Sequence, residues 1–152
     1  MIQALQITPE ILTSNTDNLN FDTVDLRTNS ANCCGWLQYM PGGSDFTIIG
    51  GGLFEISFNA NVTSETDGIV SVALKTGTGT DVEGTEMNAE VITPGNYINI
   101  SFSKLIRLCP RVNTVVAIGS LPATLTGTTT PVSTETVIPV LKDANLTIRK
   151  IA

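Results

Sequence analysis

The strongest constraint in this sequence is the alternation that follows three glycines in "GGGLFEISFNANV" (residues 50–62). Apolar residues take every second position, and the positions between them carry Glu, Ser and Asn. A period of two predicts a half-buried β-strand, because successive side chains of a strand point to opposite faces. The apolar face is expected to lie in a core. The amide-rich face lacks the usual charges, so it meets either water or another copy of itself, and the strand alone leaves both open.

The same design returns in "YINISFSKLIRL" (residues 97–108), where apolar residues again alternate with Tyr, Asn and Ser. Shorter alternating segments and turns rich in Gly and Pro fill most of the remaining chain. Pro139 is expected to confine its strand to an edge or a bulge. We see no useful run of helical periodicity and no internal repeat. The predicted fold class is all-β, an antiparallel β-sandwich or barrel.

The 152 residues suffice for one domain with a sizeable core. We expect residues 1–18 to form an N-terminal arm and residues 19–152 to form the domain. The arm is apolar without strict alternation. Two interpretations stay open: an edge strand or arm folded back on the domain, and an anchor that docks on a larger body.

Charge and composition exclude several classes of function. Only 14% of the residues are charged, the net charge is −6, and there is no histidine. A nucleic-acid partner is not expected without a basic stripe, and His-based catalysis is excluded. Asp81, Glu83 and Glu86 are interpreted as solvated turn acids, although a structural cation such as Ca²⁺ remains open. We expect no enzyme activity and no cofactor.

Cysteine usage and the N-terminus bear on location. Three cysteines, Cys33, Cys34 and Cys109, are expected to be reduced thiols of a protein made in a cytoplasm, with a bridge to Cys109 as the alternative. The N-terminal residues do not fit a signal peptide, and no segment is long and apolar enough for a membrane span. We therefore expect no membrane insertion.

The stretch "FTIIGGGLFEISFNANVTSETDGIVSVALKTG" resembles the central part of the tumour-necrosis-factor-like and complement globular-head jelly rolls. The matching positions are Phe46, Gly52, Phe54, Ile56, Phe58, Val72 and Leu74. Within that superfamily the chain is most similar to small virion proteins of phages and prophages of gut bacteria. The segments that carry this finer likeness are "FDTVDLRTN", "CGWLQY", "GLFEISFNANVT" and "SFSKLIR".

This resemblance implies a non-enzymatic structural or adhesive virion component, such as a head fibre or capsid decoration protein. It implies a homotrimer of side-by-side jelly rolls, made in the bacterial host cytoplasm and displayed on the particle. The expected subunit contacts are the short polar residues of the two alternating strands, Ser57, Asn59, Asn61, Tyr97, Asn99 and Ser101. Ile2, Leu5 and Ile7 are the candidate anchor to capsid or other virion proteins. Residues 77–84 and 120–134 are candidates for the exposed apex.

The alternative is a carbohydrate- or receptor-binding module, either a phage fibre tip or a bacterial surface or spore protein. Its partner would be a host-surface glycan. In that case Trp36 and Tyr39 would stack on sugar rings, whereas a core or interface role is the simpler interpretation of both.

Overall fold

The computed structural model describes most of the chain, and every regular element in that part is a β-strand. The described residues are 1–13, 17–26, 35–39, 43–77, 79–109, 113–121 and 137–152. The strands form two sheets that face each other, and all of their pairings are antiparallel. The predicted all-β sandwich is confirmed.

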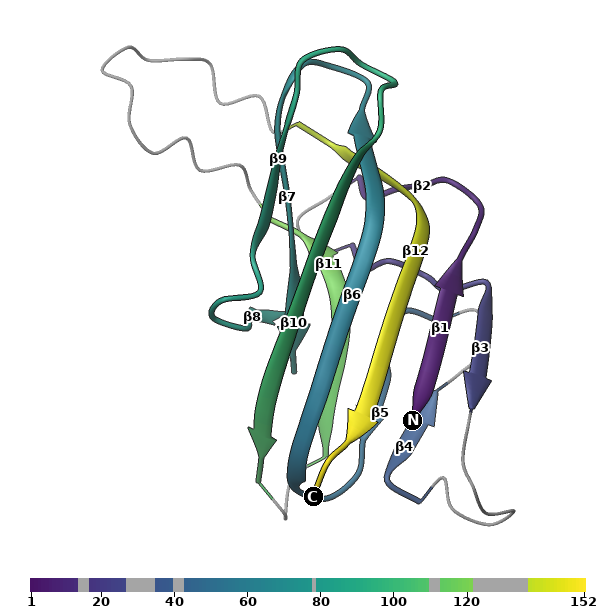
Figure 1. Cartoon of the computed structure of the whole chain (residues 1–152), viewed down its shortest axis with the longest axis vertical. Coiled ribbons are helices and arrows are strands. Elements are labelled where there is room, and N and C mark those ends of the chain that lie inside the picture. The colour runs from purple at the N-terminus through teal and green to yellow at the C-terminus, as the bar shows by residue number, and fades with distance from the viewer. Residues whose placement is uncertain (14–16, 27–34, 40–42, 78, 110–112, 122–136) are drawn as a thin grey trace.

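Sheet A, in front in Figure 1, has the strand order β10-β6-β12-β1-β3, with β2 paired to β12. Its strands are β1 (Ile2–Gln6), β2 (Glu10–Ile11), β3 (Thr23–Leu26), β6 (Gly52–Ser64), β10 (Ile98–Leu108) and β12 (Pro139–Lys150). The two alternating segments of the sequence are therefore neighbours, since β10 pairs with β6 along its whole length.

Sheet B has the order β4-β5-β11-β7-β8, with β9 also paired to β7. Its strands are β4 (Leu37–Tyr39), β5 (Phe46–Ile48), β7 (Gly68–Thr76), β8 (Thr80–Asp81), β9 (Met87–Val91) and β11 (Thr114–Ser120). The turn sequence "PGGS" at residues 41–44 predicts a hairpin between its flanking strands. β4 and β5, on either side of it, pair antiparallel as this requires.

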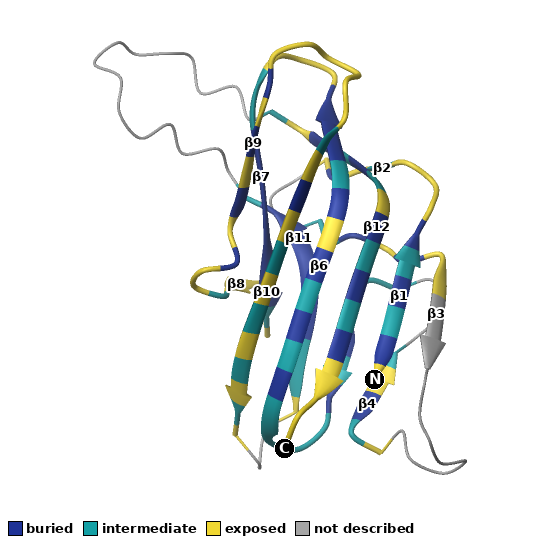
Figure 2. Cartoon of the chain, viewed as in Figure 1, coloured by how far each residue is buried: buried dark blue, intermediate teal, exposed yellow. Residues whose placement is uncertain are grey.

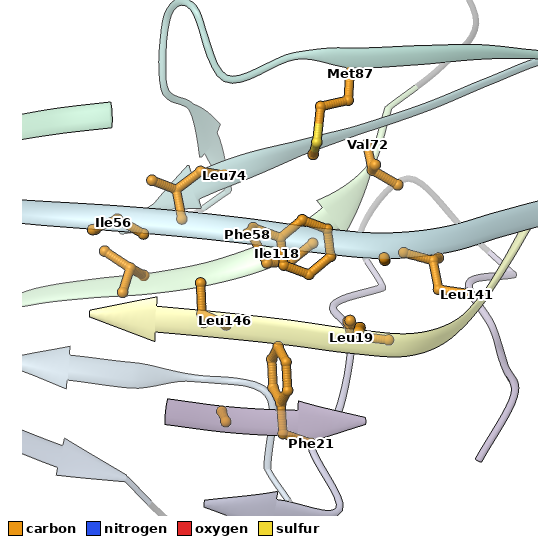
Figure 3. Close-up of a cluster of buried hydrophobic side chains, with 14 of the residues drawn as sticks. Leu19, Phe21, Ile56, Phe58, Val72, Leu74, Met87, Ile118, Leu141 and Leu146 are labelled. Carbon is orange, nitrogen blue, oxygen red and sulfur yellow. The ribbon is translucent and has the colours of Figure 1, made fainter. Parts of the chain in front are cut away.

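The core lies between the two sheets and follows the alternation of β6. Phe54, Ile56 and Phe58 are fully buried, and Figure 2 shows dark bands alternating with lighter ones along β6 and β12. Figure 3 shows Phe58 packed among side chains of both sheets, including Leu74 and Ile118 of sheet B. Burying a side chain of this size contributes about 1.5–3 kcal/mol, so this row holds the sandwich together.

One expectation about strand position needs correction. Pro139 does not confine its strand to an edge: it is the first residue of β12, which lies between β6 and β1. At the first position, the missing N–H costs little ladder bonding. The register of β12 shifts between Lys142 and Asn145, so the expected bulge lies a few residues later.

The N-terminal residues are part of the sandwich. β1 lies between β12 and β3, and the side chain of Ile2 is fully buried. β1 is therefore a strand of sheet A, and the division of the chain at residue 18 stays a prediction. Ile2 is unavailable for docking while β1 stays in the sheet, whereas Ile7 is 63% exposed.

Two carboxylates fasten the turn after β1. Oδ2 of Asp22 accepts hydrogen bonds from the backbone N–H groups of Ile7 (2.8 Å) and Thr8 (3.0 Å). Glu10 accepts bonds from the backbone N–H (2.9 Å) and the side-chain amide (2.6 Å) of Asn20. The backbone bonds from Thr8 and Ile7 lower the pKa of Asp22, whereas burial is the main cause that raises the pKa of Glu10.

The lowered pKa of Asp22 predicts a pH-dependent contribution to stability. Because the pKa is lower in the folded chain, the contribution is present above the unfolded pKa, near 3.9, and is lost as pH falls through the folded pKa. We expect Asp22→Asn to lower the free energy of unfolding at pH 7 and to have a smaller effect at pH 3. Urea denaturation at both pH values measures this, and an equal effect at both would contradict it.

Candidate functional site: the outer face of sheet A

The outward side chains of residues 57–61 in β6 and 99–103 in β10 form one continuous polar surface. In the register of the two strands, Asn59 lies opposite Ser101 and Asn61 lies opposite Asn99. Ser57 follows on the same face of β6, and Tyr97 directly precedes β10. The structure thus brings five of the six predicted contact residues together on one face of sheet A, with Tyr97 at its end.

Hydrogen bonds organise the end of this surface near Tyr97. Nδ2 of Asn99 donates to Oδ1 of Asn61 (3.3 Å) and to the carbonyl oxygen of Ala60 (3.2 Å). Nδ2 of Asn61 donates to Oδ2 of Asp143 in the bulge of β12 (3.2 Å). These bonds hold the amides in fixed positions, so this part of the surface is preorganised.

Asp143 has an unusual backbone. Its φ is +51°, in the left-handed region that residues other than glycine seldom adopt. Aspartate tolerates this region better than most residues, and the bulge places its carboxylate beside Asn61.

The face continues beyond the predicted residues onto β12 and β1. Asn145 lies opposite Asn59, Thr147 lies opposite Ser57, and Gln3 follows opposite Thr147. Sequence reasoning missed these three residues, although the polar alternation in "NLTI" and "IQALQ" carries the same signal. We call the whole surface the small-polar face, defined by its central residues Ser57, Asn59, Asn61, Asn99, Ser101, Ser103, Asn145 and Thr147.

In β6, β10 and β12, whose residues the structure describes throughout, the charged side chains on this side of the sheet lie toward the two ends of the small-polar face. At one end, Nζ of Lys142 lies 4.0 Å from the centre of the Tyr97 ring, a cation–π contact. At the other end, Nε of Arg149 lies 3.7 Å from Oε2 of Glu55, and both side chains are substantially exposed. A centre depleted of charge is one feature of protein interfaces, although serine itself is depleted in them.

Two buried side-chain oxygens in β12 and β6 have no hydrogen-bond partner in the described part of the chain. They are Oδ1 of Asn145 and Oγ1 of Thr63. A buried acceptor left unpaired costs about 1–3 kcal/mol.

The aromatic residues considered for sugar stacking are used in packing. Tyr39 stacks on Phe46 at 4.7 Å between ring centres, and its hydroxyl donates to the carbonyl oxygen of Phe21 (3.0 Å). Trp36 packs against Phe54 at 5.6 Å. Both rings are partly buried against the core, in agreement with the simpler interpretation.

The remaining candidate sites are dispersed or undescribed. Asp81, Glu83 and Glu86 are exposed, and the described residues contain no cluster of three or more His, Cys, Asp or Glu that could hold a metal ion. Cys109 is an exposed free thiol. Cys33, Cys34 and residues 122–134 of the expected apex loop lie outside the described residues. In the described ranges, no helix has the length and apolarity to cross a membrane.

Comparison with known proteins gives a fold and no sequence family. No family model matches the sequence, and no curated protein matches it. The globular domain of zebrafish complement 1qA protein superimposes with a TM-score of 0.61 at 12% identity, covering 99% of this chain and 96% of that one. The Eiger TNF of S. frugiperda gives 0.62 at 10% identity, covering 100% and 92%.

The chain has the TNF- and complement 1q-like jelly-roll fold. The predicted jelly roll is thereby confirmed. At these identities the likeness extends to the fold alone, so what this jelly roll does has to be argued from its own surface.

The structural role of Tyr39 is testable. Replacing it by Phe removes the hydroxyl that donates to Phe21 but keeps the ring on Phe46. We expect Tyr39→Phe to lower the free energy of unfolding by about 0.5–1.5 kcal/mol, the usual worth of such a bond. Urea denaturation measures this, with Tyr97→Phe as the matched control, and equal stability of Tyr39→Phe and the unmodified protein would contradict the assignment.

Proposed function

We propose that this jelly roll is a non-enzymatic structural or binding module that self-associates as a homotrimer through the small-polar face. The observation that carries the proposal is the uncharged centre of that face, which spans β10, β6 and β12 and has charged residues only toward its ends. The family resemblance adds the three-fold, side-by-side arrangement.

The side chains of the face suit close packing of subunits. Serine, threonine and asparagine are short, so a second backbone can approach closely. No charged group in the central rows would lose its hydration on contact. Three-fold closure needs a heterologous interface, in which this face meets a different surface of the neighbouring subunit.

The finer part of the proposal is a place on a phage particle, as a head fibre or capsid decoration protein made in the bacterial host. The sequence resemblance of "FDTVDLRTN", "CGWLQY", "GLFEISFNANVT" and "SFSKLIR" supports it. Ile7 is exposed and Leu5 half-buried, so these two members of the proposed anchor can contact capsid or other virion proteins. Many displayed copies would give avidity from weak individual contacts.

Self-association can be tested by placing charge in the centre of the face. Asn59→Lys with Asn61→Lys brings two ammonium groups to positions that a neighbouring subunit would cover, and we expect the trimer dissociation midpoint to rise at least tenfold. For a trimer this is a hundredfold rise in the dissociation constant, about 2.7 kcal/mol per trimer. Sedimentation of a dilution series measures this. Thr80→Lys with Asn113→Lys adds the same charge at exposed positions of the sheet B side and should leave the midpoint unchanged.

Two outcomes of that experiment would overturn the proposed interface. One is a trimer that dissociates at the same concentration with and without the Asn59 and Asn61 substitutions. The other is equal weakening by the control pair, which would show that the effect of added charge is not specific to the small-polar face.

The virion role needs its own test. We expect peptides of this chain to copurify with DNA-filled particles through a density gradient when the phage or prophage that encodes it is induced. Ile7→Asp should reduce the recovery while leaving the isolated trimer intact, because Ile7 is exposed outside the small-polar face. Particles without this chain would contradict the virion role and leave self-association standing.

A further inference from the structure

Lys75 and Asn18 meet above Gly119, on the sheet B side of the molecule. The side chain of Lys75, in β7, is only 6% exposed, which is unusual for lysine. A Cβ atom built on Gly119 would lie 2.8 Å from Lys75 Cε and 2.8 Å from Asn18 Oδ1. Lys75 Cε and Asn18 Oδ1 therefore lie no more than twice 2.8 Å apart. Any side chain larger than that of glycine at position 119 would collide with both of them.

The backbone fixes Asn18 in this position. Asn18 forms an isolated antiparallel bridge with Gly119, and the N–H of Leu19 donates to the carbonyl oxygen of Ile118 (2.7 Å). Lys75 pairs with Ala117 on the opposite edge of β11. The two side chains therefore reach toward each other across β11 from neighbouring strands.

The carboxamide of Asn18 is buried on one side and hydrogen-bonded on the other. Its Oδ1 is enclosed and has no partner in the described structure, whereas its Nδ2 donates to Oδ1 of Asp45 (3.3 Å). Asp45 Oδ1 also accepts from Ser44 Oγ (3.0 Å). A carboxylate thus touches the nitrogen that would leave if the amide carbon were attacked.

We propose that Lys75 and Asn18 form an intramolecular isopeptide bond, without any other reactant. Asp45 takes a proton from the Lys75 ammonium, directly or through water, and the neutral Nζ attacks Cγ of Asn18. The Nζ–Cγ bond forms, the Cγ–Nδ2 bond breaks, and Asp45 returns the proton to the leaving nitrogen, which departs as ammonia. The second proton that Nζ loses as the amide forms passes to this ammonia and gives the ammonium ion. Lysine ammonium and carboxamide are converted to an amide and one ammonium ion, with no change in oxidation state.

Placement of the two groups lowers the barrier of an otherwise slow reaction. Holding two groups in reacting geometry can be equivalent to an effective concentration of roughly 10⁵–10⁸ M of one of them. Nζ does not hydrogen-bond Oδ1 of Asn18 in this structure, so the terminal torsions of Lys75 have to turn before attack. The product ties the segment between β2 and β3 to β7 of sheet B.

The mass of the intact folded protein tests the bond directly. Loss of ammonia lowers the mass by about 17 Da, and we expect this deficit in the unmodified chain after incubation in native buffer. Lys75→Arg and Asn18→Ala should each keep their full calculated mass. Lys104→Arg, a matched change at a half-buried lysine of β10, should still show the deficit, and Asp45→Asn should acquire it more slowly.

Peptide mapping separates this bond from a succinimide, which has the same mass deficit. Trypsin cannot cleave after an acylated Lys75, so the expected product joins residues 1–27 to residues 28–104 through their side chains. An unmodified chain that keeps its full mass, or one that loses ammonia but is still cleaved after Lys75, overturns the proposal. Neither result depends on how well the variants fold or on the oligomeric state.

Discussion

Burial of the inward row of β6 is the interaction on which the rest of this molecule depends. Phe54, Ile56 and Phe58 are fully enclosed between the sheets, and β6 is paired along both of its edges, with β10 and β12. Alternate residues of a strand point to opposite faces, so once Phe54 and Phe58 face the core, Ser57 and Asn59 must face outward. The small-polar face is thus fixed by the same register that fixes the core.

Much of the fold could be predicted because its signals are local. The alternation in β6 and β10 identifies two strands and the division of each into a core side and an outer side. The position of Pro139 could not be predicted, because a proline at the first residue of a central strand looks in sequence like one at an edge. The inclusion of β1 in sheet A also depends on pairings with β12 and β3, which are distant in sequence.

The candidate site residues likewise divide into those that local alternation predicts and those that depend on contacts between segments distant in sequence. The five strand residues of the predicted contact surface were found because cross-strand neighbours share a face. The hydrogen-bond partner of the Tyr39 hydroxyl and the approach of Lys75 and Asn18 above Gly119 could not be found, because they arise where separate strands meet in space. Nothing in the sequence indicates that Lys75 of β7 will lie near Asn18, which precedes β3 in the chain.

The edge of sheet A is consistent with association through a face. β10 is the edge strand, and its inward Lys104, at the register position opposite Ile56, reaches Gly84, where an added Cβ would lie 3.0 Å from its Nζ. An inward-pointing lysine on an edge strand disfavours the addition of further strands from another chain. Lys104 thus disfavours pairing of a second chain with the edge of β10, whereas no such charge lies in the centre of the small-polar face beside that edge.

The most direct test of this account is the absolute mass of the unmodified protein, by size-exclusion chromatography with light scattering over a dilution series. Burial of the small-polar face predicts three times the chain mass of 16.1 kDa, persisting on dilution. A monomer at every concentration would contradict it, and the serine and asparagine rows of β6 and β10 would then be the solvated side of an isolated jelly roll.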